Sequence, residues 1–468
     1  MTAASLKENA SDNQSASDSV CVLLAEQFGQ RFSTSESLRE QHAHTTTWLP
    51  NQAPSGVVFP ETTEEVAAVV KLCAEHGVPI IPFGVGTSLE GHVNAPFGGI
   101  SIDLSNMNAV LEVNADDLDC RVQAGITRKQ LNVELRETGL FFPIDPGADA
   151  TLGGMAATRA SGTNAVRYGT MRENVLGLTV VMADGQIIKT GGRARKSSAG
   201  YDLTHLLIGS EGTLGVITEL TMKLHGIPES ISGGLCPFPD IDAACNAVIM
   251  TIQCGLPVAR IELLDEVQIR ACNQYSKLTL AEKPTLFLEF HGSEQSVREQ
   301  AERFGEISHE FGGDEFVWAT EAEERSRLWQ ARHDAFWAGK SYRPGHAAVT
   351  TDVCVPISQL AACIHQTKED IDELDLTAAI VGHVGDGNFH VLVLFDDKIA
   401  GLGRTVEGFV ARLNERAIAM SGTCTGEHGI GQGKIKYLEQ EHGEAVDIMR
   451  QLKMTLDPKG IMNPGKIF

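Results

Sequence analysis

The chain has 468 residues, of which 42% are apolar and 21% charged, and its formal net charge is −23. This length predicts two or three globular domains. The negative charge argues against nucleic acid as a partner, because phosphates require Lys and Arg, and against attachment to anionic lipid by charge alone. No apolar run is long enough to span a bilayer. Ten cysteines without a C-x-x-C pair predict reduced, mostly buried thiols.

Residues 1–18 are polar and rich in Ser and Ala, a composition that predicts a disordered tail. The segment has no apolar core and no Arg, so it signals neither secretion nor mitochondrial import. We therefore expect a cytoplasmic protein, with peripheral attachment at the inner face of the membrane as the alternative. Residues 19 to about 45 are expected to be helical.

A β-α-β unit follows. The predicted strand Val57–Pro60 leads into an amphipathic helix that ends at His76, with Thr62 or Thr63 as its N-cap. Residues 78–82 then form a second strand, which runs directly into a glycine-containing loop.

That loop, residues 83–91, is the first sign of a cofactor. Gly84 and Gly86 let the backbone approach a ligand, and the hydroxyls of Thr87 and Ser88 could cradle phosphate together with backbone N–H groups. It is neither a Walker A loop nor a G-x-G-x-x-G fingerprint. Taken alone, it is equally consistent with a tight turn.

Small residues are dense in three further segments, 145–157, 161–170 and 206–218, with a predicted strand at 175–183 between the last two. Backbone without large side chains can lie against an extended, flat ligand. With the first loop, these segments resemble, in order, the vanillyl-alcohol-oxidase-type FAD-binding domain, over about residues 50–227.

The resemblance implies non-covalent FAD, because the Leu89-Glu90-Gly91 context of His92 differs from that of family members that attach FAD through a histidine. It implies that the first loop holds the pyrophosphate and that the small-residue segments line the channel for the rest of the cofactor. The implied FAD-binding residues are Pro82, Gly84, Gly86, Thr87, Ser88, Pro146, Thr151, Gly154, Ser161, Gly162, Asn164, Glu211, Gly212, Gly215, Ile217 and, near the flavin ring, Asn463.

From about residue 239 the pattern changes to interleaved helices and strands around an antiparallel sheet. We predict helices at 241–254, 265–274, 293–311 and 401–420, and strands at 260–264 and 285–291.

Two apolar runs flank a turn-forming sequence at Gly385–Asn388, which predicts a β-hairpin. A four-residue loop would set His383 directly opposite His390, with both side chains on one face and Cβ atoms roughly 5 Å apart. Two imidazoles so placed can bind one metal ion. A hydrogen-bonded core role is the alternative for each histidine taken alone.

Three more residues complete a candidate site. Glu427 offers a carboxylate to the same metal, and His428 could then remove a proton from an alcohol, or instead orient Glu427. Arg332, among aromatic residues, is a candidate anchor for a substrate carboxylate. A surface salt bridge is the default alternative for an arginine.

Residues 382–390, 422–431 and 457–466 resemble the corresponding motifs of FAD-linked D-2-hydroxyacid dehydrogenases, and the form of 423–429 is nearest to flavin D-lactate dehydrogenases. The resemblance implies that His383, His390 and Glu427 bind Zn or Mn and contact substrate, that His428 is the catalytic base, and that Arg332 holds the carboxylate.

Oxidation of D-lactate to pyruvate is the implied reaction, with quinone, cytochrome or an electron-transfer flavoprotein as electron acceptor and a homodimer as one option for assembly. Leu392 stands where hydroxyglutarate-acting relatives have asparagine, so a small substrate fits better. D-2-hydroxyglutarate dehydrogenase, a glycolate oxidase flavin subunit and a non-enzymatic flavin- or metal-binding subunit are the alternatives.

The predicted fold is α+β. We expect a disordered tail at 1–18, a two-part FAD-binding domain at 19–227, an α+β cap domain with the metal-binding hairpin at 228–422, and a C-terminal segment at 423–468 that packs on the FAD-binding domain.

Overall fold

The computed structural model describes residues 3–319 and 322–468, which form two compact units. The first comprises Met1–Ala160, Thr170–Gly226 and Glu427–Phe468, and the second comprises Ser161–Gly169 and Ile227–Gly426. The boundaries differ from the predicted domains in two places. Residues 161–169, expected in the FAD-binding domain, belong to the second unit, and the returning segment starts at Glu427 rather than at residue 423.

The first unit begins with the predicted β-α-β motif. Helix α3 (Thr63–His76) is capped by the Thr62 side chain, which accepts a hydrogen bond from Glu65 N, and ends at Gly77 with a φ of +67°. The two flanking strands are both parallel to a third strand that lies between them, and one short antiparallel strand completes the sheet. Its order is β1 (Phe32–Ser33), β2 (Gly56–Val58), β4 (Ile100–Asp103), β3 (Ile80–Phe83).

A five-stranded antiparallel sheet forms the second part of this unit, and α3 packs against it. Both parts share one hydrophobic core. The strands lie in the order β5 (Val110–Asn114), β6 (Asp119–Gln123), β10 (Gly215–Lys223), β8 (Val175–Met182), β9 (Ile187–Gly191). The remaining elements of the first unit include α2 (Glu36–Gln41), α4 (Arg128–Glu134), α5 (Leu152–Thr158), α7 (Met171–Asn174), α8 (Leu203–Leu207), α16 (Leu438–His442), α17 (Ala445–Leu456) and the pair β7 (Leu140–Phe141) and β11 (His225–Gly226).

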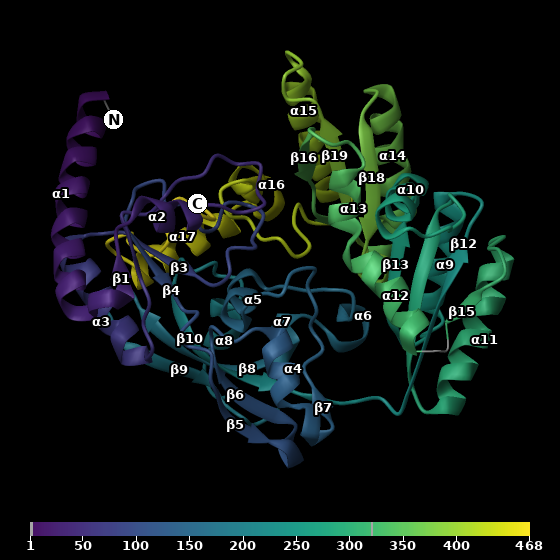
Figure 1. The fold of residues 1–468 in the computed structure, drawn as a ribbon, viewed down its shortest axis with the longest axis horizontal. Helices are drawn as coiled ribbons and strands as arrows, with labels where there is room; N and C mark the ends of the chain where they lie inside the picture. Colours follow the sequence, from purple (N-terminus) through teal and green to yellow (C-terminus); the bar gives the residue numbers. More distant parts are fainter. Residues whose placement is uncertain (1–2, 320–321) are drawn as a thin grey trace. The chain divides into compact units, whose positions relative to one another are not determined.

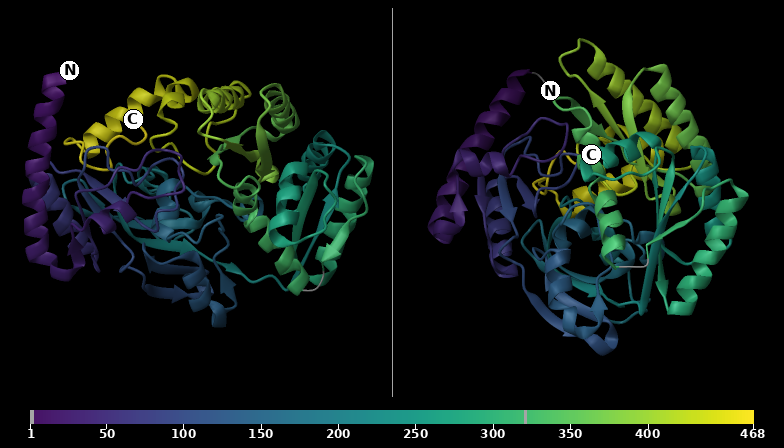
Figure 2. Two further views of the ribbon diagram at one scale, coloured as in Figure 1. Left: turned by 45° about the horizontal axis from the view of Figure 1, so that its top comes forward. Right: turned by 45° about the vertical axis from the view of Figure 1, so that its right-hand side comes forward.

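The N-terminal segment differs from its prediction. Residues 3–18, expected to be disordered, are the first part of one continuous helix, α1 (Ala3–Phe28), seen clearly in Figure 2. Val20, Leu24 and Phe28, spaced by one helical turn, are buried in the core of the first unit. This apolar stripe packs the C-terminal part of α1 against the core.

The second unit is built on an antiparallel sheet, drawn in teal and green in Figure 1. Its order is β15 (Val317–Ala319), β12 (Ser230–Pro237), β14 (Thr285–Gly292), β13 (Val258–Leu264), β18 (Thr377–Gly382), β19 (Asn388–Phe395), β16 (Ala347–Thr350), and β17 (Val353–Cys354) also pairs with β19. The predicted helices and strands of this half are confirmed, with ends shifted by a few residues.

Helices cover both faces of this sheet. One hydrophobic cluster joins the sheet to α9 (Ile241–Gln253), α11 (Glu294–Glu310), α14 (Leu360–Glu373) and α15 (Leu402–Ala419). A second, smaller cluster joins the opposite face to α10 (Glu266–Ser276), α12 (Ala322–His333) and α13 (Ala335–Ser341). Side chains alternate between faces along a strand, so Val381 and Leu264, which belong to the smaller cluster, mark the face that carries the candidate site. The short helix α6 (Ala165–Tyr168) also belongs to this unit.

The prediction that the thiols are mostly buried is confirmed. All ten cysteines are free, and seven of them are buried: Cys73, Cys120, Cys236, Cys245, Cys272, Cys363 and Cys424.

The helical assignment of α1 has a direct test in two single substitutions on the same helix. Leu24 is fully buried, so Leu24→Ala should lower the free energy of unfolding by about 2–5 kcal/mol, the usual cost of a core leucine. Val22 is 60% exposed, and Val22→Ala should leave stability within about 0.5 kcal/mol of the parent protein. Equal effects of the two substitutions in chemical denaturation would contradict the packed helix.

Candidate active site

The two hairpin histidines come together, but not in the predicted register. His390 faces Val381 across the β18–β19 pair, and His383 lies beyond the end of β18. The loop spans 383–387 rather than 385–388, because it contains a 3-10 turn at Val384–Asp386 that closes on Gly387 at a φ of +80°. The ring centroids of His383 and His390 are nevertheless 5.5 Å apart, with the rings at 87°.

His383 is oriented by a carboxylate that the sequence did not reveal. Glu262, on β13, has a side chain only 1% exposed, and its Oε1 is 2.8 Å from His383 Nδ1. Arg332 Nε donates to Glu262 Oε2 at 2.9 Å. Continuing the β13–β18 register, in which Leu263 faces Gly382, sets Glu262 opposite His383. The strand pairing therefore explains this contact.

Arg332 is thus a buried arginine and not a surface ion pair. The predicted substrate anchor already binds a protein carboxylate. A guanidinium has five N–H groups, so its bonds to Glu262 through Nε and Nη2 use only part of its capacity. Trp329, one turn earlier on α12, is buried against Phe287 and fixes the helix on this face of the sheet.

His390 is also oriented by oxygen atoms at its Nδ1, from a different part of the chain. Its Nδ1 lies 3.1 Å from Thr351 O and 3.6 Å from Asp352 Oδ1. Asp352 is fully buried; Asn388 Nδ2 donates to its Oδ1 and Thr425 Oγ1 to its Oδ2, both at 2.8 Å. Asp352 is the second carboxylate that sequence analysis missed. An acidic residue within a run of strand-forming residues, 347–355, was the available signal.

Both histidines therefore have Nδ1 held by an oxygen, which makes Nε2 the nitrogen suited to bind a ligand. Metal-bound histidines commonly have this arrangement, because a carboxylate or carbonyl at one nitrogen fixes the ring and its tautomer. Two imidazole nitrogens oriented in this way could bind a divalent metal ion.

Glu427 and His428 lie where the chain passes from the second unit to the first. Just before them, Thr423 pairs with Cys354 and a Cβ on Gly426 would come within 2.2 Å of Asn388 Nδ2, so this end is anchored beside the His390 support.

In the first unit, predicted FAD-binding residues from separate segments lie together. A Cβ on Gly84 would be 2.2 Å from Thr151 Oγ1, and one on Gly154 would be 3.0 Å from the same atom. A Cβ on Gly212 would be 2.9 Å from Pro82 Cγ. These glycines allow three segments to approach closely at the carboxyl end of β3.

Two buried polar atoms in this region fit a bound cofactor. Ser88 Oγ, in the predicted phosphate loop, is buried without a hydrogen-bond partner, and so is Asn463 Oδ1. Asn463 Nδ2 donates to His92 O at 3.1 Å and to Glu211 O at 2.7 Å, so its amide is held firmly in place. A cofactor with phosphate and ring polar groups would satisfy such atoms, and the residues present fit FAD.

The remaining predicted FAD-binding residues divide between the two units. Ser161, Gly162 and Asn164 belong to the second unit, where Asn164 Oδ1 accepts from Arg260 Nε at 2.9 Å. In the first unit, Ile217 lies in the core, and Gly215 packs against β8. The loop residues Gly86 and Thr87, and Pro146, are at least partly exposed. Their roles, and non-covalent attachment, stay predictions.

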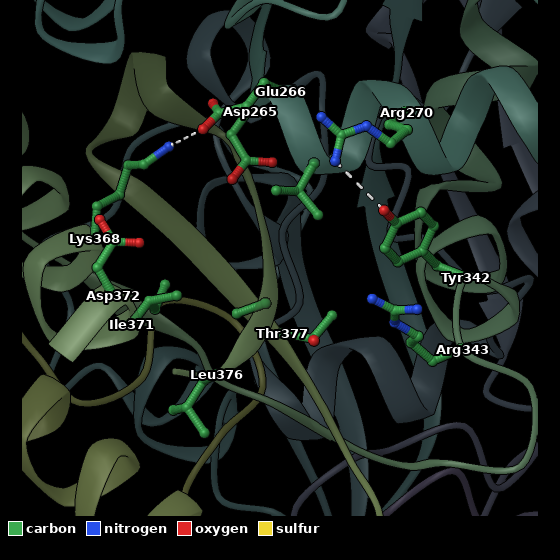
Figure 3. A pocket seen from close by; sticks show the side chains of 12 residues that line it. Asp265, Glu266, Arg270, Tyr342, Arg343, Lys368, Ile371, Asp372, Leu376 and Thr377 are labelled. Atoms are coloured by element: carbon green, nitrogen blue, oxygen red, sulfur yellow. Dashed lines mark hydrogen bonds and ion pairs between the residues drawn. The ribbon is translucent and has the colours of Figure 1, made fainter. Parts of the chain in front are cut away.

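A small cavity of about 240 Å³ in the second unit is distinct from this site (Figure 3). Its lining includes Asp265, Arg270 and Tyr342, and Thr377 at the start of β18. His383 follows the other end of that six-residue strand, about 20 Å away at roughly 3.3 Å per residue.

Two family models match the chain: "FAD binding domain" over residues 54–191 and "FAD linked oxidases, C-terminal domain" over residues 227–467. The relatives include "Probable D-lactate dehydrogenase, mitochondrial" of Danio rerio, 52% identical over 93% of this chain and 88% of its own length. "D-lactate dehydrogenase [cytochrome], mitochondrial" of Arabidopsis thaliana is 49% identical over 88% of this chain and 73% of its own length.

A crystal structure of p-cresol methylhydroxylase with bound substrate superimposes with a TM-score of 0.81, at 17% identity over 97% of each chain. At this identity the likeness concerns the fold. It confirms the predicted two-domain FAD-binding architecture with antiparallel sheets.

The prediction of a cytoplasmic location is wrong, because close relatives are named as mitochondrial proteins. The composition of residues 1–18 did not carry information on the compartment. Among the described residues, no helix combines the length and apolar character needed to cross a bilayer.

Asp265, which lines the cavity in Figure 3, leads to a prediction of how the stability of the fold depends on pH. Burial, and secondly the charge of Glu266, raise the pKa of Asp265 from 3.8 to about 7. The folded state therefore binds this proton more tightly than the unfolded state, and stability is lost as pH rises from about 4 to about 7.

Asp265→Asn should remove this loss and keep the helix cap, since asparagine caps as well as aspartate and Asp265 accepts from Gln268 N. At pH 8 we expect a gain on the order of 1–3 kcal/mol relative to the parent protein, shrinking towards pH 4. The exposed Asp372→Asn is the matched control for thermal unfolding at pH 5 and 8. A gain independent of pH would contradict the assignment.

Proposed function

This chain belongs to the FAD-linked oxidases, and we propose that it oxidises D-lactate to pyruvate with FAD as its cofactor. The names and identities of the relatives support the substrate. The observation that carries the proposal is the arrangement on one face of the second unit's sheet, where the buried Arg332 and His383 share one carboxylate, Glu262, and the ring of His390 lies next to that of His383. A 2-hydroxy acid presents complementary groups, a carboxylate beside a hydroxyl.

In this proposal Arg332 binds the substrate carboxylate. Glu262 holds two of its N–H donors, which orients the planar guanidinium before substrate arrives. The remaining donors can bind a carboxylate, and bidentate geometry would fix the orientation of C2. Pre-oriented groups lower the entropy cost of reaching a reactive geometry.

His383 and His390, with Glu427 as the third ligand, are the residues that we propose hold a divalent metal, Zn or Mn. What such an ion would supply is positive charge next to the substrate hydroxyl, which lowers the pKa of that hydroxyl. Glu262 and the Thr351–Asp352 segment keep the two rings in place through Nδ1.

His428 is the proposed base, which accepts the hydroxyl proton as the C–H bond at C2 breaks. A neutral imidazole near pH 7 suits this step. The chemistry that bound FAD supplies is acceptance of the hydride from C2. The proton and the hydride together account for the two-electron oxidation of the alcohol to the 2-oxo acid.

Leu392 supports a small substrate. It is two residues beyond His390 on the same strand, so both side chains lie on one face of the sheet. Leu392 is 3% exposed, and a Cβ on Gly339 of α13 would come within 2.4 Å of its Cδ2. A second carboxylate next to Leu392 would be buried without a polar partner from this residue, at a cost of several kcal/mol.

A cytochrome-type electron acceptor fits the name of the Arabidopsis relative.

The visible spectrum of the purified protein tests the proposed activity. D-lactate should bleach the yellow absorbance faster than D-2-hydroxyglutarate or glycolate does. His428→Ala should keep FAD and lose roughly 10²- to 10⁴-fold in rate, as expected for a lost general base. The exposed His76→Ala, at the end of α3, should match the parent protein. Full activity of His428→Ala would favour a non-catalytic subunit. A preference for D-2-hydroxyglutarate would contradict the proposal that Leu392 selects a small substrate.

The metal proposal has a test that does not depend on activity. Glu262→Gln should weaken Zn or Mn binding by roughly 10- to 100-fold, because the orienting carboxylate of His383 is lost. Glu289→Gln is the matched control: this buried carboxylate pairs with His291 at 2.8 Å and Arg260 at 3.5 Å, neither of which is a proposed ligand. Metal content after dialysis distinguishes them, and equal losses in the two variants would contradict the role of Glu262.

A further inference from the structure

The backbone that directly follows His428 is held by a buried carboxylate in the first unit. Both oxygens of Glu211 accept main-chain hydrogen bonds, Oε1 from Ile430 N at 2.7 Å and Oε2 from Gly431 N at 2.8 Å. The side chain of Glu211 is only 3% exposed. Charged hydrogen bonds shielded from water are among the stronger contacts in a protein, so Glu211 fixes this part of the chain.

His92 is a second partner of the Glu211 carboxylate. Its Nε2 is 3.2 Å from Glu211 Oε2, and its side chain is 6% exposed. Burial by itself would raise the pKa of Glu211, but His92 and the amides of Ile430 and Gly431 more than offset it, and the pKa is lowered. The carboxylate is therefore ionised when it receives these hydrogen bonds.

The loop is shaped to fit this pair. Gly429 has a φ of +82°, and a Cβ there would lie 2.6 Å from Glu211 Oε1 and 2.8 Å from His92 Nε2. Further along, Gln432 N donates to Glu90 O at 2.7 Å, and Ile467 N donates to Gly431 O at 3.0 Å. Four consecutive residues after His428 are thus fixed by close packing or by hydrogen bonds within the first unit.

Glu211 itself is held in a conformation that has a cost. Its φ is +54°, in the left-handed region that residues other than glycine seldom adopt. The surrounding bonds maintain it, since Glu211 N donates to Ala157 O at 2.8 Å and Glu211 O accepts from Asn463 Nδ2 at 2.7 Å. Strain that is kept in place by the surrounding structure is characteristic of functional sites.

We propose that Glu211, supported by His92, is a positioning residue that holds the Gly429–Gly431 backbone and thereby sets the place of His428. The resemblance had implied that Glu211 binds FAD; here its carboxylate is directed at the loop. The catalytic consequence rests on the proposed function, whereas the structural consequence does not.

Glu211→Gln tests this role with little change in shape. A carboxamide offers one acceptor and one NH₂ group, so one of the two loop amides would face a donor. Hydrogen–deuterium exchange of a peptide covering 429–434 should accelerate by roughly 10- to 100-fold, the loss expected for a charged hydrogen bond. The exposed Glu137→Gln, also in the first unit, is the control and should leave exchange unchanged.

Activity supplies the second measurement. If Glu211 positions His428, Glu211→Gln should lower kcat by at least tenfold, with KM for D-lactate and FAD content close to those of the parent protein, and Glu211→Asp, which is one methylene shorter, should not restore kcat. Unchanged exchange in 429–434 would overturn the proposal, as would loss of FAD without faster exchange, which would favour the implied FAD contact.

Two further outcomes are separable. Faster loop exchange in a protein whose parent form does not oxidise D-lactate would support the positioning role and contradict the proposed function. If Glu211→Gln does not fold, the same exchange experiment is carried out on His92→Gln. That variant leaves the carboxylate of Glu211 in place. Unaltered protection of 429–434 in that variant would overturn the supporting role of His92.

Discussion

Glu262 is the carboxylate on which the candidate substrate face of the second unit depends. A buried carboxylate without partners would cost several kcal/mol. Arg332 and His383 together remove that cost, and in doing so they tie helix α12, strand β13 and the end of β18 to one point. The same carboxylate orients a proposed substrate anchor and a proposed metal ligand, so the geometry of the two is linked.

The first unit uses buried charge in a comparable way. The C-terminal residues return to β3, where Ile80 N donates to Ile461 O and Asn463 N donates to Ile80 O, both at 2.8 Å. Lys453 Nζ donates to Thr213 O at 2.7 Å and to Met462 O at 2.8 Å. Burial lowers the pKa of Lys466 to about 7, with Glu211 acting in the opposite direction, and its ammonium is bonded to Asn94 O. These contacts join β3, residues Asn94 and Thr213, and the C-terminal segment that carries Asn463.

The sequence by itself determined the elements with strong local signals. A helix cap at Thr62 or Thr63, the apolar runs of the hairpin and the order of the glycine-containing segments depend on neighbours in the chain. Residues 382–390 and 422–431 carried enough specificity to indicate the family. These signals are local, so they survive without knowledge of the fold.

Only the tertiary structure decided the register of the hairpin, the partners of the histidines and the place of Glu211. The register depends on Gly387 and on how Gly385 packs against Ile261, a residue more than a hundred positions away. Three carboxylates could be assigned a role only after the fold brought them to their partners. Glu262 pairs with His383 across 121 residues, Asp352 with His390 across 38, and Glu211 with Ile430 across 219. A buried charge is recognisable only when its partners are known, and distance along the chain hides those partners.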